Sequence, residues 1–312
     1  MPNQNNNLLK TLAFFDLFNY PLTAWELWCF NPDKQSYKET LEQINQTVFR
    51  RQDGFYFLNN QSLIITRQNR YNLADKKFKL ARRAAWFFSR LPWIELVALV
   101  NSIGSHNLRA EGDLDFFIVT KPKRLWLSRL IITSWLKILN LRPTAKKNQN
   151  TFCLSFWVDS ENLNLNNYRL NNDPYFSYWL ACLNPLFDKN QKYSRLIEAN
   201  PWLNRELPNW QPLQPLSEHL LSINQKIHQI PAFAEMAKKI FVNFWIKFLN
   251  SLELLAKKLQ LKIMPPQIKN LANQDTRVVI NDGVIKLHPL DRRQFFQEKH
   301  QEILSRYENK NF

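Results

Sequence analysis

Asn101-Ser-Ile-Gly-Ser-His-Asn-Leu-Arg-Ala-Glu-Gly-Asp-Leu-Asp-Phe-Phe-Ile-Val119 is the stretch of sequence that decides the fold. Asp113 and Asp115 stand at the start of its apolar run. Alternate side chains of a strand point to opposite faces, so we expect the two carboxylates on one face, roughly 6–7 Å apart along the backbone. Magnesium prefers hard oxygen ligands and usually takes one or two protein carboxylates together with phosphate oxygens, so the pair predicts a divalent metal site for phosphoryl or nucleotidyl transfer. A solvated turn before a core strand is the alternative interpretation.

A second apolar run precedes the acidic pair. Trp93-Ile-Glu-Leu-Val-Ala-Leu-Val100 predicts a buried strand that ends in small polar residues. This order of strand, small-residue turn and Asp-x-Asp strand resembles the catalytic core of the DNA polymerase beta-like nucleotidyltransferases. The resemblance covers about residues 91–160. It implies transfer of a nucleoside monophosphate from a nucleoside triphosphate to an acceptor hydroxyl, with release of pyrophosphate and with Mg²⁺ or Mn²⁺ held by Asp113 and Asp115.

The turn of the family signature fits this chain in two ways. Gly104-Ser105 keeps the usual residue types but leaves seven residues before Asp113, whereas Asn101-Ser102 leaves the usual ten and has Asn in place of Gly. We prefer the second fit, because Asn is the residue that best replaces Gly at positive φ. The resemblance then implies that Ser102, or failing that Ser105, holds the triphosphate together with nearby backbone N–H groups, with Gly104 in the same turn.

The residues that follow Val119 continue the resemblance. A helix is predicted over about 124–140, and its Arg129 is either a phosphate-binding cation or part of a solvated basic face. The resemblance implies a third carboxylate on the next strand, predicted at Thr151–Val158, which contains no acid. Asp159 is the candidate third ligand and base, with Glu161 beside it, if this strand runs antiparallel to the one that bears Asp113. A parallel crossover would place Asp159 on the order of 20 Å from Asp113.

Composition and charge limit the class of protein. The 312 residues and 45% hydrophobic content suit two or three domains with apolar cores. No long uncharged apolar stretch and no signal-peptide pattern occur, so we expect a cytoplasmic protein without a membrane span. Three widely spaced cysteines are typical of reduced core thiols. The net charge of +16 makes nucleic acid the natural macromolecular partner.

We expect an α+β protein with a nucleotidyltransferase-type mixed sheet flanked by helices. Residues 1–70 predict a winged-helix-like domain, 71–195 the nucleotidyltransferase core, and 196–312 a mostly helical C-terminal region. In the first part, Thr23 and Ser36 are placed to start helices, and Asp53-Gly54 predicts a tight hairpin. Arg50 and Arg51 beside this hairpin suit contact with DNA or RNA, with protein docking as the alternative.

Two further segments are amphipathic. Residues 68–90 carry Lys76, Lys77, Lys79, Arg82 and Arg83 on one side, which predicts a solvated basic face or a phosphate-binding one. Residues 232 to about 262 combine an apolar side with interrupting lysines. Core packing is the expected role of this second segment, and a helix on a membrane surface is the alternative.

Two other functional classes are compatible with the same sequence. The missing acid inside the strand Thr151–Val158 and the net charge would also suit a non-enzymatic nucleic-acid-binding or regulatory protein built on an inactive transferase fold. A small-molecule transferase of the antibiotic-modifying kind would need an acidic pocket for a cationic acceptor, and the positive charge balance argues against it.

Overall fold

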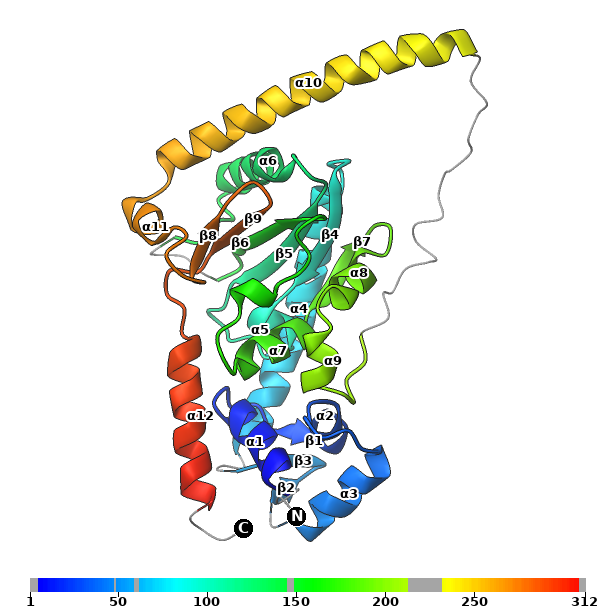
Figure 1. Cartoon of the computed structure of the whole chain (residues 1–312). Coiled ribbons are helices and arrows are strands. Elements are labelled where there is room, and N and C mark those ends of the chain that lie inside the picture. The colour runs from blue at the N-terminus through cyan, green and yellow to red at the C-terminus, as the bar shows by residue number, and fades with distance from the viewer. Residues whose placement is uncertain (1–4, 48, 59–61, 145–148, 213–231, 309–312) are drawn as a thin grey trace.

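The computed structural model describes residues 5–47, 49–58, 62–144, 149–212 and 232–308. They combine helices with a six-stranded mixed sheet and a three-stranded antiparallel sheet, which confirms the predicted mixed α and β class. The larger sheet lies in the middle of the molecule, and the smaller one lies at one end among the N-terminal helices (Figure 1).

The N-terminal unit contains three helices and three short strands. They are α1 (Asn5–Asp16), β1 (Leu22–Thr23), α2 (Ala24–Cys29), α3 (Tyr37–Gln46), β2 (Arg50–Gln52) and β3 (Phe55–Phe57), and the sheet order is β1-β3-β2. Capping boxes start α2 at Thr23 and α3 at Ser36, as predicted. The β2–β3 turn has positive φ at Asp53 and Gly54, which explains the Asp-Gly pair at this position.

The central sheet is built from distant parts of the chain. Its strands are β4 (Ile94–Leu99), β5 (Leu114–Thr120), β6 (Phe152–Asp159), β7 (Asn184–Asp188), β8 (Val278–Ile280) and β9 (Val284–Leu287), in the order β7-β4-β5-β6-β9-β8. β4 and β5 are antiparallel, whereas β5 and β6 are parallel and are joined by α6 (Leu125–Ile138). Asn281-Asp-Gly283 forms the turn of a β8–β9 hairpin, which adds two strands of the C-terminal region to this sheet.

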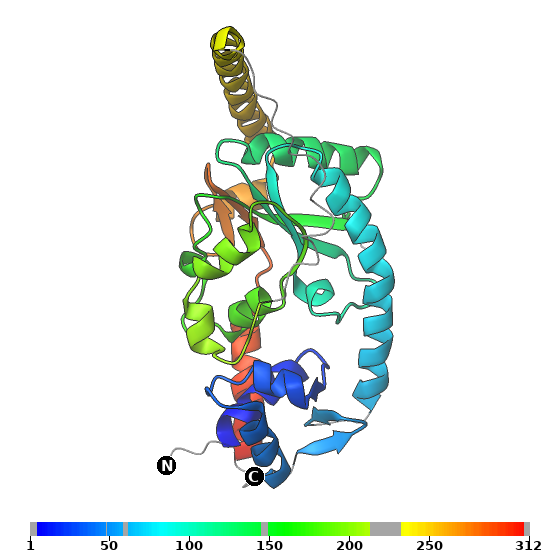
Figure 2. The same ribbon diagram turned by 90° about the vertical axis from the view of Figure 1, so that its right-hand side faces the viewer.

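The remaining helices surround the sheet. They are α4 (Ser62–Phe88), α5 (Asn101–Gly104), a 3-10 turn η1 (Asn166–Tyr168), α7 (Pro174–Ala181), α8 (Lys192–Glu198), α9 (Trp202–Glu206), α10 (Ala232–Ile263), α11 (Pro266–Leu271) and α12 (Arg293–Glu308). α4 runs from the N-terminal unit along the sheet, and α10 lies across the far end beside α6 (Figures 1 and 2). Within the described residues, no helix combines the length and the apolar character needed to cross a bilayer.

Two apolar clusters cover the two faces of the central sheet. One joins the sheet to the N-terminal unit, to α7–α9 and to Leu304 of α12, and the other joins it to α4, α6 and Ala256 of α10. The predicted boundary at 70/71 falls inside α4, and the boundary at 195/196 falls inside α8. The three predicted parts therefore share their cores.

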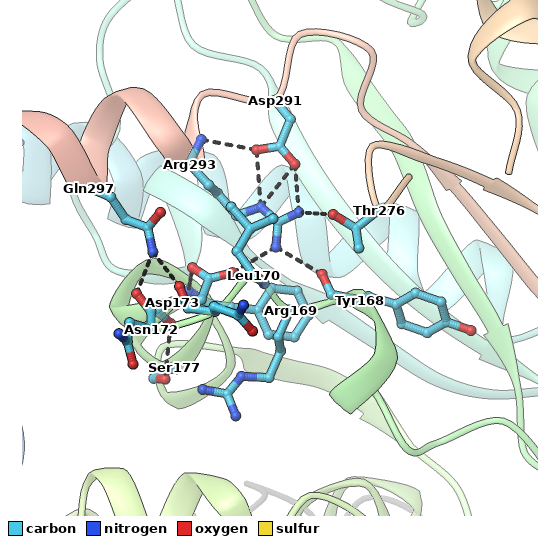
Figure 3. Close-up of polar contacts among 12 residues, drawn as sticks. Tyr168, Arg169, Leu170, Asn172, Asp173, Ser177, Thr276, Asp291, Arg293 and Gln297 are labelled. Carbon is cyan, nitrogen blue, oxygen red and sulfur yellow. Dashed lines mark hydrogen bonds and ion pairs between the residues drawn. The ribbon is translucent and has the colours of Figure 1, made fainter. Parts of the chain in front are cut away.

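A buried ion network fixes the start of α12 to α7 (Figure 3). Arg293 donates from Nη1 to Asp173 Oδ2 over 2.7 Å and from Nη2 to Asp291 Oδ2 over 2.7 Å. It also donates from Nε to both carboxylate oxygens of Asp291, and from Nη1 and Nη2 to the carbonyl of Tyr168 and the hydroxyl of Thr276. Asp173 is fully buried and also caps α7 by accepting from the Phe176 N–H. This network positions the C-terminal wall of the cavity described below.

Candidate metal and nucleotide site

The turn between β4 and β5 has the backbone that the Asn101-Ser102 fit requires. Asn101 has φ +58°, in the left-handed region that favours Gly and Asn. Gly104 lies three residues further on, inside α5, where a Cβ atom would lie 2.8 Å from the Cys182 carbonyl oxygen. Gly104 is therefore required by close packing. Ser102 and Ser105 border the adjacent cavity, and Gly104 does not.

Asp113 and Asp115 lie on one face of the β5 edge, as their spacing predicts. Cys153 of β6 is directly opposite Asp115 in the parallel register. Potential ligand atoms of these three residues all lie within 4.8 Å of one another. The Asn101 side chain and the Cys153 thiol both hydrogen-bond Asp115. The acidic pair and Cys153, called the acidic cluster below, thus join the turn to two neighbouring strands.

The electrostatics of the acidic cluster favour a bound cation. Burial, followed by the charge of Asp113, raises the pKa of Asp115 to about 7, and burial also raises the pKa of Asp113. Burial and the neighbouring carboxylates raise the pKa of the Cys153 thiol, so the thiol stays protonated beside the two acids. The charges of Arg142 and Lys77 oppose the rise in the pKa of Asp113, but neither residue forms an ion pair with it among the described residues, and two carboxylate groups so placed fit Mg²⁺ or Mn²⁺. The thiol is a ligand type that softer metals prefer.

Basic residues of α4 hold the loop that leads to the acidic cluster. Lys77 is buried and donates from Nζ to the carbonyl oxygens of Gly112 over 3.1 Å and of Ala110 over 3.4 Å. Arg70 donates to Asn107 Oδ1 over 3.0 Å. Part of the predicted basic face of this helix therefore has a structural role, whereas Lys76, Lys79, Arg82 and Arg83 are exposed.

A cavity of about 710 Å³ opens beside the acidic cluster. Aromatic residues from α1, the turn after it, α7 and α12 form much of its wall, including Phe18 of the turn, Tyr175 and Phe296. Its charged lining is balanced, because Arg109, Lys286, Arg292 and Arg293 face Glu111, Asp113, Asp115 and Asp291. A volume of this size is within the range of small-molecule sites, and it can hold a nucleotide.

Asp159 does not complete the acidic cluster, which corrects the prediction for this residue. β6 runs parallel to β5, so Asp159 pairs with Thr120 at the opposite end of the strand from Asp113. Its carboxylate instead accepts hydrogen bonds from the Glu161 N–H and the Asn162 amide. Asp159 therefore shapes the turn after β6, and Glu161 lies in that same turn.

Arg129 also lies away from the cavity. It is half-buried in the contact between α6 and α10, where it donates from Nη1 to Gln260 Oε1 over 2.7 Å. Burial, followed by the charge of Arg142, lowers its pKa to about 10. Neither alternative considered from the sequence, a phosphate ligand or a solvated face, describes this half-buried side chain, which is bonded to Gln260.

Three residues near the acidic cluster were missed as site candidates in the sequence. Cys153 occupies the strand position where the family resemblance implies an acid. Arg142, after α6, donates to the Phe152 carbonyl over 3.0 Å, and its charge opposes the rise in the pKa of Asp113. Lys286 lines the cavity from β9, where it lies opposite Phe156 of β6 in the strand register. Of the three, only Cys153 could have been found from the sequence. If the helix after the Asp113 strand is a parallel crossover, the second residue of β6 lies beside Asp115.

Comparison with known protein-family models and with curated protein sequences finds no match to this chain.

Proposed function

We propose that the protein is a metal-dependent nucleotidyltransferase that moves a nucleoside monophosphate from a nucleoside triphosphate to an acceptor hydroxyl. The observation that carries this proposal is the convergence of Asp113 and Asp115 at the edge of a cavity that Ser102 also lines. In this reaction the acceptor oxygen bonds to the α-phosphorus, and the bond from that phosphorus to the pyrophosphate oxygen breaks. The finer fold assignment, a nucleotidyltransferase-type core with a winged-helix-like N-terminal unit, is part of the same proposal.

Each wall of the cavity has a role in this proposal. Asp113 and Asp115 hold Mg²⁺ or Mn²⁺, and the bound cation neutralises triphosphate charge. Ser102 and Ser105 offer hydroxyl groups to phosphate oxygens. The aromatic wall suits the faces of a planar base. Asn101 and Cys153 orient the Asp115 carboxylate through hydrogen bonds.

The test is metal-dependent nucleotide binding and transfer. Each of the four nucleoside triphosphates is added with Mg²⁺ and thermal stabilisation is measured, since a ligand that binds the folded state raises its melting temperature. Transfer of labelled nucleotide is then assayed. Asp113→Asn should abolish both responses, and Asp159→Asn, which removes the same charge at the opposite end of β6, should preserve them. No nucleotide response from the wild type, or an equal loss in both variants, contradicts the proposal.

A second candidate function is binding or regulation without catalysis, on an inactive transferase fold. Cys153 favours this alternative, because a protonated thiol replaces the third carboxylate that the resemblance implies. Cys153→Asp distinguishes the two candidates. An inactive fold should show nucleotide or nucleic-acid binding but no transfer in the wild type, and the added acid should create metal-dependent transfer or strengthen metal binding.

A further inference from the structure

One side of α10 is fixed to α6 by specific contacts. Glu253 accepts hydrogen bonds from the N–H groups of Trp126 and Leu127, both over 2.8 Å, at the start of α6. Gln260 donates to the Trp126 carbonyl oxygen over 2.8 Å, and Ala256 is buried between these two residues. This face of α10 is therefore accounted for by packing within the chain.

A neighbouring face of α10 is apolar and exposed. Seven of the sixteen exposed large hydrophobic residues in the described part of the chain lie between positions 245 and 263 of this one helix. With 3.6 residues per turn, five of the seven fall within a sector of about 80°. These five, called the apolar stripe below, are Trp245, Phe248, Leu255, Leu259 and Ile263, with exposed fractions from 43% to 67%. So dense an apolar surface marks an interaction site.

The exposed charged residues on this part of α10 are all lysines, and one exposed acid, Asp282 of the turn between β8 and β9, lies beside them. Lys247, Lys258 and Lys262 are exposed on α10, and Lys257 pairs with Asp282 over 2.6 Å. Glu253 is the only acid between positions 245 and 263, and it is buried against α6. The exposed polar residues of this part of α10 thus carry positive charge and no negative charge.

We infer that the apolar stripe of α10 binds the surface of an anionic lipid membrane. An interfacial helix places Trp, Phe and Leu side chains among the acyl chains and its lysines among the headgroups, and this is the distribution on α10. Each lysine near an anionic surface adds favourable electrostatic energy, and the whole chain carries +16. A second copy of the chain fits less well, because a matching α10 would bring further lysines beside the same lysines.

Flotation or co-sedimentation with lipid vesicles tests this inference. Wild-type protein should bind vesicles that contain phosphatidylglycerol far better than vesicles of phosphatidylcholine alone, and added salt should weaken the binding. Leu255→Gln with Ile263→Gln should lower the partition into anionic vesicles by about tenfold, since apolar area is lost at two exposed sites. Lys258→Glu with Lys262→Glu should lower the partition into anionic vesicles by at least about fivefold for each lysine replaced.

Matched variants separate the apolar stripe from general surface effects. Ile65→Gln with Leu290→Gln changes two residues that are 64% and 88% exposed outside α10, and binding should be unchanged. Lys76→Glu with Lys79→Glu makes the same charge change on α4 and should have a smaller effect. Asp113→Asn should bind vesicles like the wild type, because the inference does not rest on the proposed activity.

Three results would overturn the inference. The first is wild-type protein that binds neither kind of vesicle. The second is an equal loss of binding in the α10 variants and in their matched controls. The third is self-association of the wild type that the substitutions at Leu255 and Ile263 abolish, with no binding to anionic vesicles, since the apolar stripe would then be covered by a second copy of the chain.

Discussion

Removing one charge of the acidic cluster should stabilise the metal-free protein and at the same time weaken its response to metal. Asp113 and Asp115 present ligand atoms within 4.8 Å of each other, and no described cation pairs directly with either carboxylate. Two unit charges 4.8 Å apart repel by about 3.5 kcal/mol at an effective dielectric constant of about 20. The nearby charges of Arg142 and Lys77, which oppose the rise in the pKa of Asp113, offset part of this repulsion. We therefore expect Asp113→Asn to raise the free energy of unfolding by about 1–3 kcal/mol in EDTA at pH 8.

Urea unfolding with and without Mg²⁺ measures both effects. In the wild type, millimolar Mg²⁺ should restore most of the free energy of unfolding that the repulsion between the two carboxylates costs. The unfolding midpoint of Asp113→Asn should hardly change with metal. Glu111→Gln is the matched control, because Glu111 lines the same cavity but is not part of the acidic cluster. Lower stability of Asp113→Asn than of the wild type in EDTA, together with an unchanged response to Mg²⁺, would refute the reasoning.

Three further predictions concern the supports of the site. Arg293→Ala should lower the free energy of unfolding by about 3–5 kcal/mol in urea, because it leaves the fully buried Asp173 without its cation; adding Asp173→Asn should restore part of the loss, and strictly additive effects would contradict a direct ion pair. Gly104→Ala should cost about 1–3 kcal/mol in the same assay, since its Cβ would lie 2.8 Å from the Cys182 carbonyl oxygen, and a neutral result would show that the turn can move. Burial, followed by the charge of Lys286, lowers the pKa of His288 to about 3, so the folded state binds this proton less readily than the unfolded state. The free energy of unfolding should therefore be highest above about pH 6.5 and fall by on the order of 1 kcal/mol per pH unit below it. His288→Asn should flatten this dependence in urea titrations at about pH 7.5 and 5.5.

Local patterns predicted the elements that carry the acidic cluster. The Asp-x-Asp spacing places both carboxylates on one face of a strand for any arrangement of the sheet. Thr23 and Ser36 predicted two helix starts, where the structure has capping boxes, and the Asp-Gly pair predicted the β2–β3 hairpin. The choice of Asn101 over Gly104 as the turn residue agrees with its positive φ. These features depend on neighbours within a few residues.

The parts that the sequence did not reveal depend on distant contacts. A strand has the same alternation in either direction, so nothing within β6 indicated that it runs parallel to β5 and carries Asp159 away from Asp113. Arg129 donates a hydrogen bond to Gln260, a partner 131 positions away, and Lys286 reaches the cavity only because β9 pairs with β6. Such pairings follow from packing of the whole chain, which a local pattern does not contain.

One helix links the N-terminal unit to the acidic cluster without a break. Near the start of α4, Arg67 donates from Nη2 to Glu26 Oε1 over 2.7 Å, and ten residues later Lys77 holds the Gly112 carbonyl next to Asp113. An α-helix is stiff over the roughly 15 Å between these two residues. A ligand that tilts the N-terminal unit would therefore shift the carboxylates as well, which couples events at one end of the molecule to the spacing of the two acids.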